Sequence, residues 1–125
     1  MIAWSIEAAL KSDCFDKVVV STDDPEIAEV ALKFGAEVPF IRPSSLSDDF
    51  TSTTPVIKHA VEALSAALNE TSLVCCLYAT APFVTPEDLK RGLEKLVTSG
   101  SDFAFSVTSY AFPIQRAIRI NSEDR

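Results

Sequence analysis

The residues best suited to hold an anionic ligand lie in a polar segment that begins at Arg42. The planar guanidinium of Arg42 donates several hydrogen bonds in one plane, which suits a phosphate or a carboxylate. Residues 51–54 place four hydroxyls beside an expected helix start, where hydroxyl and backbone N–H groups suit a phosphate or a base edge. Two alternatives stay open: Arg42 braces the segment through an ion pair with Asp48 or Asp49, and Thr54 only caps the helix.

Three other side chains are candidates for chemistry. Asp23 can bind a cation or a ribose hydroxyl, or it can cap the helix that begins at Pro25. Tyr78 can stack its ring on a base, or it can pack in the core. His59 has no Ser or Cys at a catalytic spacing, so we interpret it as a surface or packing residue. The sequence contains no Gly-rich phosphate loop, zinc-binding spacing or nucleophile motif, and we predict no metal site.

The elements that must position these residues alternate between helix and strand, which predicts an α/β fold with a mostly parallel sheet between helices. Ligands of such folds bind outside the carboxyl ends of the strands. Three candidate segments follow predicted strands, and we expect them to meet in one crevice. They are residues 21–24, 42–53 and 78–82. The expected helices are 2–12, 25–34, 54–69 and 86–99, and the expected strands are 17–21, 37–41, 72–78, 102–107 and 114–120, with Pro39 indicating an edge strand.

Composition limits the classes of function. The chain has 125 residues and a formal net charge of −7, which favours one acidic domain and argues against binding to nucleic acid or an anionic membrane. No apolar run approaches the roughly 20 residues that a membrane helix requires. The three cysteines are an odd number without a disulfide pattern. We interpret them as buried small side chains of a cytoplasmic protein.

Several blocks of the sequence resemble one enzyme family, the nonulosonic (sialic) acid cytidylyltransferases. Residues 15–28, 34–38 and 42–49 match its pattern in order and spacing. Residues 75–82 and 106–117 are most similar to the pseudaminic acid cytidylyltransferases within it. The resemblance covers essentially the whole chain.

The resemblance implies a Rossmann-like, three-layer α/β/α nucleotidyltransferase domain. It also implies a reaction in which CTP and a nine-carbon keto acid give a CMP-sugar and pyrophosphate with Mg²⁺. Pseudaminic acid is the favoured substrate, followed by N-acetylneuraminic acid, and supply of a flagellar or surface glycan is the implied role. The implied protein is a cytoplasmic homodimer.

The resemblance also implies roles for individual residues. At the sugar end of the site it suggests Gln115 and Arg116, since an arginine suits the sugar carboxylate. Tyr replaces the usual glutamine at the base, so the ring is expected to stack or the backbone to read cytosine. The residues assigned to the nucleotide are Arg42, Thr51, Thr53, Tyr78 and Ala79, with Asp23 as a further candidate.

The chain departs from the family pattern at both ends. The family's first strand and triphosphate-binding loop would precede Met1, and its magnesium-binding aspartates would follow Arg125. We therefore interpret residues 1–125 as one partial nucleotidyltransferase domain that is inactive or incomplete alone. Two alternatives remain: a related nucleotidyl- or glycosyltransferase acting on another sugar, and a non-catalytic α/β module that self-associates.

Overall fold

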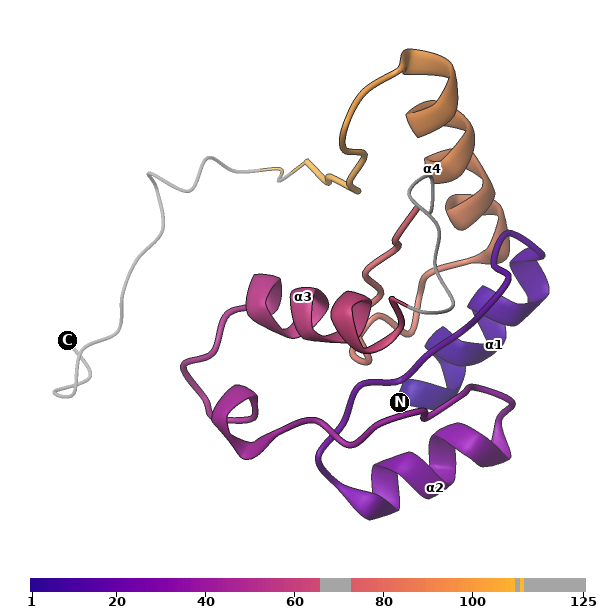
Figure 1. Ribbon diagram of the computed structural model, residues 1–125. Coiled ribbons are helices and arrows are strands. Elements are labelled where there is room, and N and C mark those ends of the chain that lie inside the picture. The colour runs from indigo at the N-terminus through magenta and orange to yellow at the C-terminus, as the bar shows by residue number, and fades with distance from the viewer. Residues whose placement is uncertain (66–72, 110, 112–125) are drawn as a thin grey trace, which may run out of the picture.

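The computed structural model describes residues 1–65, 73–109 and 111. Helices account for the regular structure of these residues, and α1 lies between α2 and α4, contacting both (Figure 1). No helix among the described residues is long and apolar enough to cross a membrane. The elements are α1 (Ile2–Ser12), α2 (Pro25–Lys33), the 3₁₀ helix η1 (Ser44–Leu46), α3 (Thr53–Ala63) and α4 (Pro86–Ser99).

Local capping explains why α2 and α4 begin at the residues that the sequence predicted. The Asp24 carboxylate accepts hydrogen bonds from the first backbone N–H groups of α2, and Pro25 occupies the first helical position. Thr85 and Asp88 form a reciprocal capping box at the start of α4. Gly100 ends α4 in the left-handed conformation, with φ 62°.

Helix α3 differs from its prediction at both ends. Its N-cap is Ser52, which makes no side-chain capping bond, and Thr54 lies inside the helix. Capping by Thr54 was therefore the wrong alternative. The helix ends at Ala63 instead of near residue 69, and residues 64–65 form a turn. No glycine follows this helix to mark its end in the sequence, which is why the periodic apolar pattern overestimated its length.

One parallel pairing represents the predicted sheet among the described residues. Glu37 N–H donates to the carbonyl of Val18 over 2.8 Å, and Val20 N–H donates to the carbonyl of Glu37 over 2.9 Å. The same register would next require an N–H at residue 39, and Pro39 has none. The following bond, from Arg42 N–H to the Thr22 carbonyl, is one residue out of register. The proline thus limits this pairing to a single bridge.

The predicted strands 72–78 and 102–107 are absent from the described residues, and this part of the prediction was wrong for them. A strand is stable only where a partner satisfies its backbone and covers a face. Neither segment pairs with another part of the chain that the structure describes, and Phe103 and Phe105 are more than four-fifths exposed. Cys75 and Cys76 are exposed as well, contrary to the expected burial. The predicted strand 114–120 lies outside the described residues.

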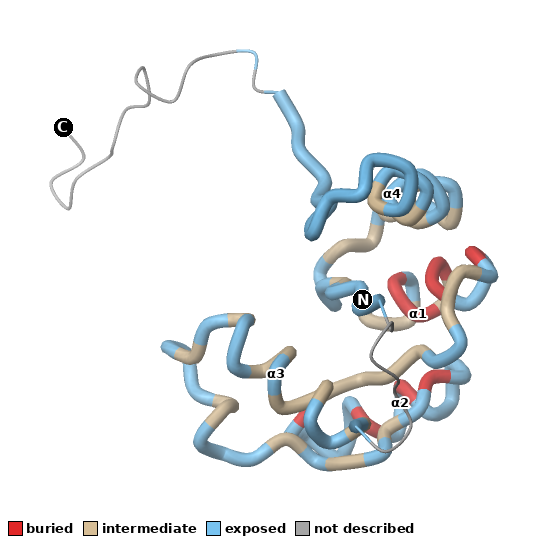
Figure 2. The backbone as a smooth tube through the Cα atoms, turned by 45° about the horizontal axis from the view of Figure 1, so that its top comes forward, coloured by how far each residue is buried: buried red, intermediate tan, exposed pale blue. Residues whose placement is uncertain are grey.

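The core lies between α1, α2 and the paired segments. Ile6, Ala31 and Ala36 are its buried centre. Figure 2 shows the buried residues gathered on α1 and α2. Four partly buried side chains pack around this centre: Ile2, Val18, Val20 and Val38. Because Val18, Val20 and Val38 belong to the paired segments, this core holds the chain that leads into Asp23 and Arg42.

Candidate functional site

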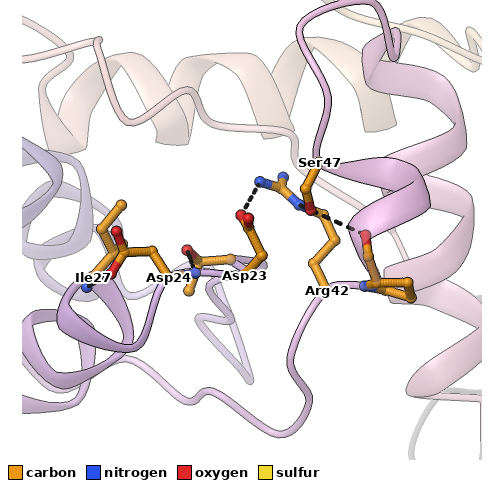
Figure 3. A network of polar contacts seen from close by, with 7 residues as sticks. Asp23, Asp24, Ile27, Arg42 and Ser47 are labelled. Carbon is orange, nitrogen blue, oxygen red and sulfur yellow. Dashed lines mark hydrogen bonds and ion pairs between the residues drawn. The ribbon is translucent and has the colours of Figure 1, made fainter.

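Arg42 is held by two side chains on either side of its guanidinium (Figure 3). Its Nη2 donates to Asp23 Oδ1 over 3.1 Å, and its Nε donates to Ser47 Oγ over 3.0 Å. The Ser47 hydroxyl in turn donates to the carbonyl of Pro43 over 3.0 Å. The Arg42 side chain is 23% exposed, so it is partly shielded but still reachable. The bracing ion pair expected with Asp48 or Asp49 is instead made with Asp23.

Asp23 is available to Arg42 because its neighbour Asp24 caps α2. Capping by Asp23 was therefore the wrong alternative. The hydrogen bond from Arg42 lowers the pKa of the Asp23 carboxyl below its ordinary value. A main-chain bond also brings Arg42 close to Asp23, because Arg42 N–H donates to the carbonyl of Thr22, the buried residue that precedes Asp23.

The pairing of Arg42 leaves donors free for a ligand. A guanidinium carries five N–H groups, and the bonds to Asp23 and Ser47 use two of them. No other described residue accepts from the remaining three, which can donate to a phosphate, a carboxylate or a carbonyl oxygen. Positioning by Asp23 and Ser47 lowers the conformational entropy that Arg42 would lose on binding.

Asp48 organises the next turn of the loop. One of its carboxylate oxygens accepts from Phe50 N–H over 3.0 Å and from Thr51 N–H and Oγ1–H, each over 2.7 Å. These bonds, the Thr51 hydroxyl foremost, lower the pKa of Asp48. The hydroxyl of Thr51 therefore donates within the loop and offers a ligand its oxygen lone pairs.

Thr53 and Tyr78 meet although 25 residues separate them in the sequence. The Thr53 hydroxyl and the Tyr78 phenol lie 2.7 Å apart in a hydrogen bond. Tyr78 is 60% exposed, so core packing was the wrong alternative for its ring. Ala79 follows in a turn closed by a hydrogen bond from Ala81 N–H to the Tyr78 carbonyl. The structure thus brings Thr53, Tyr78 and Ala79 together.

Other residues complete the description of the site. His59 packs edge-on against Phe40, with ring centroids 5.1 Å apart, which confirms its interpretation as a packing residue. Among residues 1–65, 73–109 and 111, no three His, Cys, Asp or Glu side chains form a group that can hold a metal ion. Gln115 and Arg116 lie outside the described residues.

The sequence reasoning missed Ser47 and Ser5. Ser47 lies in a stretch of several serines, and only its contact with Arg42 singles it out. Ser5 lies in an apolar helix, and its hydroxyl donates to the Tyr78 carbonyl over 3.0 Å. No sequence motif marks either contact: Ser47 bonds to Arg42 within one irregular loop, and Ser5 reaches a residue 73 positions away.

Comparison with known proteins shows the family of this chain. A family described as cytidylyltransferase matches residues 1–122. The chain belongs to the cytidylyltransferase family. Membership of this family favours a Rossmann-like nucleotidyltransferase fold, of which the described residues contain one parallel pairing.

Three relatives illustrate the likeness. The chain is 47% identical over 125 residues to a pseudaminic acid cytidylyltransferase of Campylobacter jejuni, a match that covers 100% of this chain and 54% of the relative. It is 30% identical to a Helicobacter pylori protein named pseudaminic acid cytidylyltransferase and UDP-2,4-diacetamido-2,4,6-trideoxy-beta-L-altropyranose hydrolase, covering 98% of this chain and 23% of that protein. It is 37% identical to N-acylneuraminate cytidylyltransferase A of Danio rerio, over 86% of this chain and 24% of that protein. The chain thus spans about half the length of the Campylobacter relative.

Proposed function

We propose that this chain forms the cytidine-binding part of an enzyme that transfers CMP from CTP to a nonulosonic acid and releases pyrophosphate. Pseudaminic acid is the proposed acceptor, because the identity to the Campylobacter jejuni pseudaminic acid cytidylyltransferase is 47%. The observation that carries the proposal is the arrangement of Arg42. Two side chains hold its guanidinium, and among the described residues its other three donors remain for a ligand; Thr51 lies in the same loop and Thr53 begins α3 just after it.

The proposed reaction is an in-line substitution at phosphorus. The anomeric hydroxyl oxygen of the sugar acid attacks the α-phosphate of CTP, the bond from the α-phosphorus to the bridging oxygen breaks, and pyrophosphate leaves with that oxygen. The hydroxyl proton is released to solvent. Catalysis rests chiefly on positioning and on neutralising the triphosphate charge.

The residues of this chain contribute nucleotide binding to that reaction. Arg42 donates hydrogen bonds to oxygen atoms of CTP through its free N–H groups. Thr53 and Tyr78 share one hydrogen bond, so the pair keeps one hydroxyl hydrogen and several lone pairs for the edge of cytosine. The backbone of Ala79 lies beside them in the turn. Asp23 acts through Arg42.

Mg²⁺ accompanies CTP in the proposed reaction and neutralises its phosphate charge. The part of the chain that the structure describes contains no group of residues that fits the ion. No step of the reaction is therefore assigned to metal binding by the described residues. Gln115 and Arg116 are proposed for the sugar end, where an arginine can pair with the sugar carboxylate.

The substrate nucleotide can be tested by calorimetric titration of this chain with CTP, UTP and ATP, each with Mg²⁺. Binding of CTP at least tenfold tighter than the other two supports the proposal. Equal affinities, or no binding of CTP by a folded chain, would contradict it. The sugar can be tested by mass spectrometry of the products that the full-length protein makes from CTP and pseudaminic, N-acetylneuraminic or ketodeoxyoctonic acid. A CMP-linked product from another acid alone would favour the related-transferase alternative.

A second candidate function is a self-associating module without catalysis. One observation favours it: Phe103, Phe105 and Val107 alternate along the chain, and each is more than four-fifths exposed. Such a segment can pair with another chain. Analytical ultracentrifugation with and without CTP separates the candidates, since the module predicts a dimer that binds no nucleotide. A homodimer that binds CTP fits the proposed cytoplasmic enzyme.

A further inference from the structure

We propose that Ser5 is a positioning residue for base recognition: it fixes Tyr78 so that the tyrosine hydroxyl meets the edge of cytosine. This inference rests on the proposed function. Ser5 lies on α1, is only 4% exposed, and donates its hydroxyl hydrogen to the carbonyl of Tyr78 over 3.0 Å. The two residues are 73 positions apart in the sequence. The contact therefore ties the helix to a distant corner of the site.

Tyr78 depends on such contacts because no regular element holds it. Residues 73–78 form neither helix nor strand, and the Tyr78 side chain is 60% exposed. Three hydrogen bonds to other described residues fix it instead. Its carbonyl accepts from Ser5 Oγ and from Ala81 N–H, and its phenol bonds to Thr53. Two donors thus already bond the Tyr78 carbonyl, and the hydroxyl is the polar group of the side chain that can address a base.

A second buried serine of α1 makes a different hydrogen bond, which lies within the helix. Ser12 is fully buried at the other end of α1, and its hydroxyl donates to the carbonyl of Ala9 over 2.6 Å. This is the local bond that serines in helices commonly make. Ser5 instead directs its hydroxyl outside its own helix. Ser12 therefore provides a matched control, because it is a buried α1 serine whose hydroxyl has no contact with Tyr78.

The test compares CTP affinities by calorimetry in a double-mutant cycle. We expect Ser5→Ala to weaken CTP binding about fivefold, the equivalent of about 1 kcal/mol, which is the typical net value of one hydrogen bond. We expect Ser12→Ala to change it less than twofold. In a Tyr78→Phe background, which lacks the hydroxyl that Ser5 positions, Ser5→Ala should weaken binding less than twofold. Melting temperatures establish that each variant is folded.

Two results of the cycle would overturn the inference. One is a fivefold loss from Ser5→Ala that persists unchanged in the Tyr78→Phe background, since Ser5 would then act independently of that hydroxyl. The other is an equal loss from Ser12→Ala, since a general weakening of α1 would then explain both. Failure of the proposed function is a different result, in which the folded wild-type chain binds no CTP.

Amide hydrogen exchange without nucleotide tests the contact independently of CTP. The reporter is the N–H of Ala81, which donates to the same Tyr78 carbonyl as Ser5. Ser5→Ala should speed its exchange at least about threefold, while Ser12→Ala leaves it unchanged. Equal exchange in wild type and Ser5→Ala would show that Ser5 does not position Tyr78, whatever the chain binds.

Discussion

Replacing Arg42 by alanine removes the donors that the structure holds ready for a ligand. Two of its five N–H groups are occupied by Asp23 and Ser47, and three remain. A hydrogen bond to a charged group contributes roughly 1.5–3 kcal/mol. Loss of one such bond to CTP therefore weakens binding by roughly 10- to 150-fold. We expect Arg42→Ala to fall in this range.

A lysine at the same position separates charge from geometry. Arg42→Lys keeps the positive charge but loses the planar fork, and one ammonium cannot contact Asp23 and Ser47 while also presenting a pair of parallel donors. We expect its CTP affinity to lie between those of wild type and Arg42→Ala. Calorimetric titration with CTP and Mg²⁺ measures all three proteins.

Arg91 gives the control for this experiment. It lies on α4, is 76% exposed, and pairs with Asp88 on its own helix. Arg91→Ala removes the same charge from the chain and should leave CTP affinity within twofold. If Arg42→Ala binds CTP within threefold of wild type while remaining folded, the assignment of Arg42 to the nucleotide site is refuted. An equal loss in Arg91→Ala would instead show that overall charge governs binding.

Three further predictions concern the loop, the turns and acid. Asp48→Ala should weaken CTP binding because it frees Thr51, whereas Asp48→Asn keeps an acceptor oxygen and should bind CTP as wild type does; equal calorimetric affinities for both variants would contradict this role. Gly35→Ala should lower the free energy of unfolding by at least about 1 kcal/mol because φ is +90° there, whereas Gly92→Ala, in α4 with open space around it, should raise it by roughly 0.5–1 kcal/mol; urea titration measures both. Arg42 lowers the pKa of Asp23 in the folded chain, so the ion pair stabilises the fold above the ordinary pKa of 3.8, and this stabilisation is lost as pH falls through the lower pKa of the folded state. The difference in urea midpoint between wild type and Asp23→Asn should therefore shrink as pH falls below the folded-state pKa. A difference that stays constant with pH would contradict the ion pair.

The helices were predictable wherever a local signal decides them. Asp24-Pro25 and the Thr85–Asp88 box lie within one turn of the backbone groups that they cap, so the sequence alone specifies α2 and α4. The strands were not predictable in this way. A strand at 72–78 or 102–107 needs partners that lie elsewhere, and local propensity does not supply them. Even the pairing at the predicted edge strand stops at Pro39, because proline has no backbone N–H to donate.

The residue types of the proposed site came from the sequence, but their contacts did not. Arg42, Thr53 and Tyr78 were proposed from their chemistry, their position after predicted strands and their match to a family pattern. The partner of Arg42 was not, because two adjacent aspartates were equally able to cap α2. The structure resolves this choice by giving the cap to Asp24 and the ion pair to Asp23.

The most direct test of the proposed cytidine site is a nuclear magnetic resonance titration of the ¹⁵N-labelled chain with CTP and Mg²⁺, repeated with UTP. We expect CTP to shift the backbone amides of the assigned nucleotide residues while α4 stays unchanged, and UTP to produce smaller shifts at the same concentration. A folded chain whose amides do not respond to CTP, or respond only on α4, would contradict a cytidine site here. The residues that should shift are Arg42, Thr51, Thr53, Tyr78 and Ala79.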